Sequence, residues 1–373
     1  MAQRQTTVVF EDSQRFSDAV TVNIDYSQNV RSHQEVDLMD LGEARQRAVD
    51  NGFKTAVSQA RSPWKLGQGL PINQIVAGDA IDTLNALPEN WVDLVFADPP
   101  FNIGYLYHGY KDKKSDSDYL AFSEEWMKAI YRALKPGGSF YLAIGDDFAA
   151  DLCVIARRTI GFTMRNWIIW HYTFGQQTKK KFARSHTHIF YFTKGDEGIT
   201  FNADDIRVPS ARQTVYADSR ANSKGKLPDD TWFTRPQAAQ EAGYFAPDMD
   251  TWNVSRLCGT FNEREGWHGC QMPITILDRI IKASSNEGDI VLDPFNGSGT
   301  TCVSAALHGR RFVGLDQSKE YVAYARQRIE HALDIAAGKN GHVHDKKRAS
   351  KVKTVTDAFG RPRVPRKRAT IKA

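Results

Sequence analysis

Five short apolar runs, each closed by an aspartate, set the strongest limit on how this chain of 373 residues can fold. The closing residues are Asp79, Asp98, Asp146, Asp293 and Asp316. Apolar runs without alternation are typical of strands buried on both faces, as in a parallel sheet covered by helices. Helical patterns fall between the runs, over 82–87, 123–134 and 300–307. This alternation predicts a doubly wound α/β sheet, which binds ligands at the carboxyl ends of its strands, where the aspartates would lie.

The composition excludes several classes of protein. Hydrophobic residues make up 41% and charged residues 25% of the chain, which is typical of a soluble globular protein and not of a disordered one. No apolar stretch approaches the roughly 18–20 residues of a membrane helix. The first 30 residues lack the apolar core of a signal peptide, so we expect a cytoplasmic protein without membrane association. The four cysteines are widely separated, which disfavours both a disulfide scaffold and a zinc module.

The ends and the middle of the chain differ from the predicted sheet. Residues 1–70 are polar, with one predicted helix over 35–59, and form an extension that could serve oligomerisation. Of the net charge of +5, the residues from Asp345 onward carry +9, which leaves −4 for the rest. Residues 336–373 therefore predict a basic, disordered tail, either an arm that attracts nucleic acid or a solubilising tail. Residues 201–267 are rich in turn residues and aromatics without a period, which predicts an inserted loop-rich recognition module or a structural cap.

One loop after a predicted strand combines glycines with small polar residues, in the run Asp293-Pro294-Phe295-Asn296-Gly297-Ser298-Gly299-Thr300-Thr301. Gly297 and Gly299 permit a tight turn and a close approach of the backbone to a ligand at a helix N-terminus. Asp316 closes the next strand, where a carboxylate can bind a ribose diol. The pattern predicts either a site for a nucleoside cofactor or a close structural turn between strand and helix. Cys302 stands where a dinucleotide motif would have its third glycine, which disfavours a Rossmann dehydrogenase.

A second loop, Asp98-Pro99-Pro100-Phe101, also follows a predicted buried strand directly. Its prolines fix the backbone and remove N–H donors, so that carbonyl groups are left to accept. A carboxylate beside such a carbonyl forms a pair of acceptors for an exocyclic NH2 group, and Phe101 offers a flat surface for a ring. The loop is therefore suited to an amine-bearing nucleobase. The aromatic and lysine-rich stretch over 105–114 is expected either to close over that base or to be solvated.

The two loops together resemble the motifs of amino-group DNA methyltransferases. Asp98-Pro99-Pro100-Phe101 is similar to the catalytic motif of this family, and the loop at 293–300 is similar to its S-adenosylmethionine motif. The order, catalytic motif first, resembles the circularly permuted beta class. The resemblance implies a doubly wound, mostly parallel, Rossmann-like methyltransferase sheet. It also implies a catalytic half over 71–200, a target-recognition region over 201–267 and a cofactor half over 268–335.

The resemblance further implies the roles of individual residues. The catalytic residues would be Asp98, Pro99, Pro100 and Phe101. The residues that hold the cofactor would be Asp79, Ala80, Gln271, Pro273, Asp293, Phe295, Asn296, Gly297, Ser298, Gly299, Thr300, Thr301 and Asp316. Residues 170–172, and residues 179–181 together with 184–186, lie where the family places its base-pocket and DNA-facing segments. Three residues depart from the usual pattern: Gly269 replaces a proline, Met272 a lysine and Phe101 a tyrosine.

The implied reaction is the transfer of a methyl group from S-adenosylmethionine to the N6 amine of an adenine flipped out of double-stranded DNA. S-adenosylhomocysteine would be the product, and no metal is expected. The resemblance also implies a bacterial or phage restriction-modification enzyme, a homodimer, in the bacterial cytoplasm or nucleoid. Asp98 favours adenine because cytosine-N4 relatives more often have serine at that position. A cytosine-N4 methyltransferase and an inactive DNA-binding regulator remain the alternatives.

Overall fold

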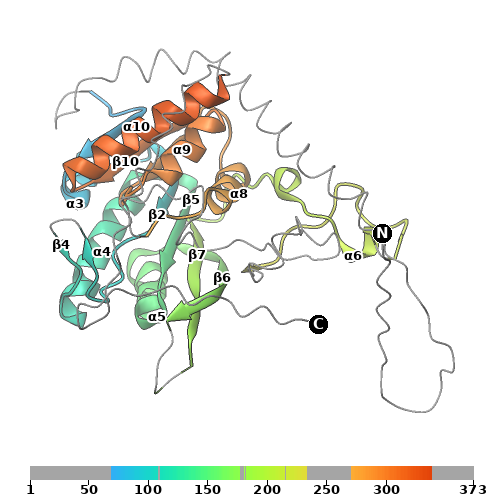
Figure 1. Ribbon diagram of the computed structural model, residues 1–373, viewed down its shortest axis with the longest axis horizontal. Helices are drawn as coiled ribbons and strands as arrows, with labels where there is room; N and C mark the ends of the chain where they lie inside the picture. Colours follow the sequence, from blue (N-terminus) through green and yellow to red (C-terminus); the bar gives the residue numbers. More distant parts are fainter. Residues whose placement is uncertain are drawn as a thin grey trace, which may run out of the picture.

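The computed structural model describes residues 69–107, 110–176, 180, 182–214, 216–232 and 270–337. Within them, an eight-stranded sheet has the order β1-β10-β9-β2-β5-β7-β6-β8 (Figure 1). Its strands are β1 (Gln74–Ala77), β2 (Val92–Ala97), β5 (Leu134–Ile144), β6 (Thr163–Gln176), β7 (Arg184–Thr193), β8 (Thr231–Trp232), β9 (Ile290–Asp293) and β10 (Arg311–Asp316). A separate hairpin pairs β3 (Leu106–Tyr107) with β4 (Tyr110–Lys111).

The sheet is mostly parallel, which confirms the predicted fold class. The neighbours β1, β10, β9, β2 and β5 are all parallel, whereas β7 is antiparallel to both β5 and β6. Strands β9 and β10 come last in the chain but lie between β1 and β2. The sheet is thus completed by strands from both sides of the middle region, as the order of the motifs predicts.

Helices cover both faces of the sheet. On one face lie α3 (Ala80–Ala86), α4 (Asp116–Ala133) and α5 (Asp146–Val154), and on the other lie α8 (Ile274–Ser284), α9 (Thr300–Leu307) and α10 (Lys319–Ala336) (Figure 1). Successive side chains of β2 point into the two layers in turn: Leu94 packs in the cluster with α8, and Val95 packs in the cluster with α4. Shorter segments are a π-helical turn over Ile155–Ile160, a 3-10 turn over Ala203–Ile206 and α6 (Ala211–Thr214).

The chain changes direction across the sheet between β2 and β9. After β9 the chain passes through α9 to β10 on one side, and after β2 it passes through α4 to β5 on the other. β2 and β9 are themselves neighbours, paired at Leu94 with Val291 and at Val95 with Leu292. In open α/β sheets, the crevice beyond the carboxyl ends of such a strand pair is the preferred place for a ligand. The two loops predicted to carry chemistry begin there.

Two predicted boundaries are corrected by the structure. The helix predicted from 123 begins at Asp116, because Ser115 caps it by accepting from the Asp118 N–H at 3.2 Å. Lys135-Pro136-Gly137-Gly138, which directly follows the predicted helix, is part of β5, and Leu134, the last residue of the prediction, already begins this strand. The predicted helix over 35–59, residues 233–267 of the middle region and the tail from residue 338 lie outside the described residues. In the described part of the chain, no helix is both long and apolar enough to span a membrane.

Candidate functional site

A cavity of about 490 Å³ opens at the carboxyl ends of β2 and β9. Both predicted loops line it, together with the segments that follow β1 and β10. The predicted site residues in its wall are Asp79, Ala80, Asp98, Pro99, Pro100, Phe101, Gln271, Asp293, Phe295, Asn296, Gly297, Ser298, Thr300, Thr301 and Asp316. Pro273 and Gly299 are not in the wall. They lie one residue before α8 and α9, respectively, as the N-cap residues of these helices.

The glycine-rich loop after β9 is held by the carboxylate of Asp293. This buried side chain accepts from the backbone N–H of Phe295 at 3.0 Å and from the hydroxyl of Thr301 at 2.6 Å. Gly299 has a φ of +78°, and a Cβ at this position would lie 2.9 Å from the Cβ of Ala325. Only glycine fits both the left-handed backbone and the close approach of α10. The loop therefore presents its backbone to the cavity in one fixed conformation.

Asp316, at the end of β10, closes the other side of this loop. Its two carboxylate oxygens accept from the backbone N–H groups of Gly297 at 2.9 Å and of Ser318 at 2.8 Å. Burial raises the pKa of Asp316 to about 6 and the pKa of Asp293 to about 7. Carboxylates with raised pKa values in a cavity wall are typical of ligand sites. The Asp316 carboxylate is thus an acceptor already oriented by two donors.

Asp79 lies beside Asp316 because β1 and β10 are paired. The N–H of Gly78 donates to the backbone carbonyl of Asp316 at 3.0 Å. The side chain of Asp79 caps α3 by accepting from the Ile81 N–H at 2.8 Å, and it also accepts from the Gln317 amide at 2.9 Å. Three predicted segments, after β1, β9 and β10, thus form one continuous wall. Gln317 extends this wall and was not predicted.

The loop after β2 is fixed from both ends. The hydroxyl of Tyr119 on α4 donates to the carbonyl of Pro100 at 2.7 Å. Farther along, the buried carboxylate of Asp112 accepts from the backbone N–H groups of Asn102 at 2.9 Å and of Ile103 at 3.3 Å. These contacts hold the backbone that carries Asp98 and Pro99. Asp98, Pro99 and Pro100 all line the cavity, and their role as a pair of acceptors stays a prediction.

Phe101 packs closely against the end of β5. A Cβ at Gly145 would lie 3.2 Å from a carbon of the Phe101 ring. Any larger residue at position 145 would therefore displace this ring. Farther round the wall stand Trp170 and Tyr172 of β6, whose rings are 5.4 Å apart at 70°. The cavity wall therefore combines carboxylates with aromatic rings. A flat, amine-bearing ring fits this combination.

The structure also brings Arg184, His186 and Thr187 of β7 into the wall, but not His171. The sequence places all but Thr187 in segments of interest without assigning them a role. Tyr172 donates from its hydroxyl to the carbonyl of His186 at 3.0 Å, which ties β6 to β7 at this level. The β6–β7 hairpin decides which of these side chains face the cavity.

Three side chains to which the sequence assigns no role could together hold a metal ion. In Asp146, His186 and His188, the potential ligand atoms lie within 4.8 Å of one another. The indole N–H of Trp167, however, donates to Nδ1 of His188 at 2.8 Å. Burial lowers the pKa of His188, and its neutral ring must then carry the proton on Nε2, which leaves no lone pair there for a metal. The arrangement favours a hydrogen-bonded cluster that orients His186 rather than a metal site.

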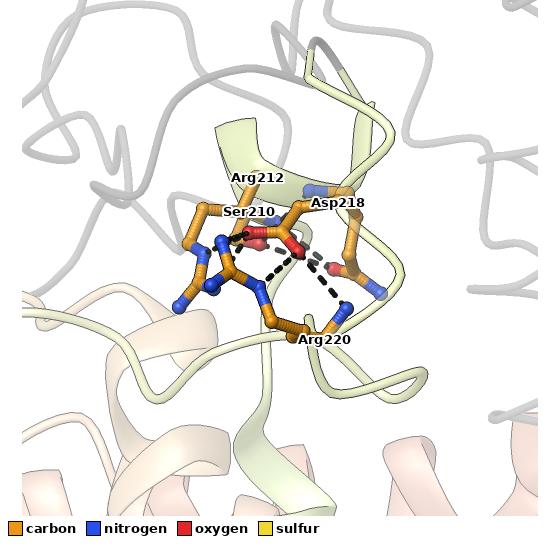
Figure 2. A network of polar contacts seen from close by, with 5 residues as sticks. Ser210, Arg212, Asp218 and Arg220 are labelled. Carbon is orange, nitrogen blue, oxygen red and sulfur yellow. Dashed lines mark hydrogen bonds and ion pairs between the residues drawn. The ribbon is translucent and has the colours of Figure 1, made fainter.

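A polar network organises the described part of the middle region. The carboxylate of Asp218 binds Arg212 Nη2 at 2.7 Å and Arg220 Nε at 3.0 Å, and Ser210 lies beside them (Figure 2). Hydrogen bonds from Arg220 and Arg212 lower the pKa of Asp218. The segment then returns to the sheet, where β8 pairs with β6 at Trp170. The loop-rich character predicted for this region agrees with its described part, and its recognition role stays a prediction.

Comparison with known proteins supplies the family context. A family model described as DNA methylase, of N6 and N4 methyltransferases, matches residues 92–327. Type II methyltransferase M.HpaI of Haemophilus parainfluenzae is 34% identical over 257 residues, which cover 69% of this chain and 74% of that protein. DNA adenine methyltransferase YhdJ of Escherichia coli (strain K12) is 32% identical over 274 residues, or 73% and 88% of the two chains. Among solved structures, the cytosine-N4-specific PvuII DNA methyltransferase has a TM-score of 0.48 at 15% identity and covers 73% of this chain and 96% of that chain.

Proposed function

The chain belongs to the DNA methylase family of N6 and N4 methyltransferases, and on that premise we propose that it methylates the N6 amine of a flipped-out adenine in double-stranded DNA. S-adenosylmethionine is the proposed methyl donor. The observation that carries the proposal is that the loops after β2 and β9 meet in one cavity, at the point where the sheet changes direction. The proposed enzyme acts as a homodimer in a bacterial restriction-modification system.

The segments after β1, β9 and β10 are the proposed donor site. Asp316 would accept from the ribose hydroxyls, and the segment at Asp79 and Ala80 would contact the adenine ring. The fit rests on the fixed backbone at Gly297 and on the oriented Asp316 carboxylate. The donor supplies a methyl group on a positively charged sulfur, and the Asp316 carboxyl in the same wall carries negative charge above its pKa of about 6.

The loop after β2 is the proposed acceptor site. The lone pair of an exocyclic amine is delocalised into its ring, which makes the amine a weak nucleophile. The Asp98 carboxylate and the Pro99 carbonyl would accept its two hydrogens and so direct the lone pair toward the methyl group. Phe101 would hold the plane of the base. Such a transfer depends on positioning and on charge stabilisation and needs neither a metal nor a covalent intermediate.

Adenine is preferred over cytosine as the target on the strength of Asp98 and of the similarity to DNA adenine methyltransferase YhdJ. Cytosine N4 is the second candidate, since the same acceptor pair would serve either amine. An inactive DNA-binding protein is disfavoured because both loops are complete and line the cavity.

Product analysis tests the proposal. The full chain is expressed in a host without adenine or cytosine-N4 methylation, and the genomic nucleosides are measured by mass spectrometry. N6-methyladenine is expected, and sequencing of the modified DNA then gives the recognised site. Asp98→Ala should abolish the signal, while Asp151→Asn, an exposed carboxylate on α5, should leave it unchanged. If only N4-methylcytosine is found, the target is cytosine N4 and not adenine N6. If the DNA is unmodified, the proposed function is wrong.

A further inference from the structure

The connection between β6 and β7 presents one large aromatic side chain to solvent. Phe182 is 99% exposed, more than any other large hydrophobic side chain in the described part of the chain. A single exposed apolar side chain is common on protein surfaces and needs no explanation by itself. What distinguishes Phe182 is its place in the fold and the charge around it.

Phe182 lies at the edge of the sheet where the cavity opens. Since β5 and β6 are each antiparallel to β7, β6 ends and β7 begins at the same edge as the carboxyl ends of β2 and β9. Arg184, the first residue of β7, lines the cavity. Two residues of extended chain span at most about 7 Å, so the Cα of Phe182 is within that distance of the Cα of a cavity-lining residue.

The charge around Phe182 is complementary to a phosphate backbone. Lys180 is exposed, and the sequence has lysine on both sides of it. Among the described residues at this edge, Asp146 and Asp147 are paired with Arg184, at 2.8 Å and 2.9 Å. The connection thus offers an exposed ring with basic residues next to it, beside a cavity suited to a nucleobase. Nucleic-acid-binding surfaces use this pairing of aromatic and basic side chains.

We propose that Phe182 inserts into the base stack of duplex DNA at the position that the target base leaves. This inference rests on the proposed function, since it needs a base to be extruded. Extrusion costs unstacking and unpairing, and an apolar side chain inserted between base steps fills the gap and stacks on the neighbouring bases. Phe182 then differs from Phe101, which faces the extruded base inside the cavity.

A comparison of two DNA substrates, one with the target base paired and one with it unpaired, separates insertion from a general DNA contact. Single-turnover methylation is measured for the wild type, Phe182→Ala and Phe182→Trp on a duplex that contains the recognised site. The same measurement is made on a duplex with an abasic position opposite the target base. Phe182→Ala should slow methylation of the paired duplex about 5- to 150-fold, the range for loss of an aromatic side chain that stacks on a base. Most of this loss should disappear on the abasic duplex, because an unpaired base costs less to extrude. Phe182→Trp should stay near the wild-type rate on both.

Two controls complete the test. Ile335→Ala removes an exposed apolar side chain near the C-terminal end of α10. This variant should methylate both duplexes at the wild-type rate. Lys180→Ala should weaken binding to both duplexes and reduce the slope of log affinity against log salt by about 0.9. If Phe182→Ala slows both duplexes equally, or slows neither, the insertion role is wrong. A wild-type protein that methylates neither duplex would instead overturn the proposed function.

Discussion

Cofactor affinity should depend on pH through Asp316. The side chain is largely buried, which raises its pKa to about 6, and the N–H groups of Gly297 and Ser318 hold its ionised form in place. An ionised carboxylate can accept from both hydroxyls of a ribose, whereas the protonated form loses part of this capacity. Because proton binding competes with cofactor binding, the affinity should be constant above pH 7 and should fall as the pH drops through 6.

The size of the effect follows from this pKa. With a pKa of about 6, roughly a tenth of the carboxyl groups are ionised at pH 5 and nearly all at pH 8. The affinity should therefore fall about tenfold between these pH values, which corresponds to about 1.4 kcal/mol. Asp316→Asn removes one hydrogen bond from a ribose hydroxyl to a charged acceptor, worth about 1.5–3 kcal/mol. Its affinity at pH 8 should be about 10- to 150-fold weaker and nearly independent of pH.

Isothermal titration calorimetry at pH 5 and pH 8 tests this, with S-adenosylmethionine and S-adenosylhomocysteine as ligands. Asp151→Asn is the control variant, because this carboxylate is exposed on α5 and is not part of the cavity wall. This variant should keep the tenfold decrease in cofactor affinity between pH 8 and pH 5. S-adenosylhomocysteine lacks the sulfonium charge. If the affinities for both ligands decrease at pH 5, the pH dependence therefore arises from the ribose contact. The reasoning is refuted if Asp316→Asn retains the wild-type pH dependence, or if the wild type binds equally well at pH 5 and pH 8.

The strands and the paired loops could be predicted from sequence because the relevant signals are local. A strand buried on both faces needs a continuous apolar run, and the backbone constraints at Asp98-Pro99-Pro100 and at Gly297 and Gly299 are visible in the residues themselves. Neighbouring parallel strands then bring their carboxyl ends together. Four of the five closing aspartates line the cavity, whereas Asp146 begins α5 and pairs with Arg184.

Which side chains of β6 line the cavity could not be predicted from a local motif, since that depends on register. Trp170 and Tyr172 face the cavity because β6 pairs with β7 in one register, with His171 opposite His186. A shift by one residue would turn each of these side chains to the other face. The β6–β7 register is set by the hairpin and its packing, which no short motif encodes. The resemblance located the segments, and the structure selects which of their residues reach the site.

Three further predictions can be tested directly. Asp98→Ala should lower single-turnover methylation about 100-fold or more, as removal of one preorganised polar group does, while calorimetry shows S-adenosylmethionine affinity within twofold of wild type. Gly299→Ala should lower the melting temperature more than Gly288→Ala, because both positions have positive φ but only the Cβ at 299 would meet Ala325. The last prediction concerns the basic tail. If its net charge of +9 attracts DNA, each phosphate that it neutralises contributes about 0.9 to the slope of log affinity against log salt. Truncation after Gly341 should flatten that slope by about 4, for roughly four to six contacts, and should leave the sequence preference intact, because phosphate contacts carry no base information. A solubilising tail predicts parallel salt dependences for the full and truncated chains, and that result would exclude the arm.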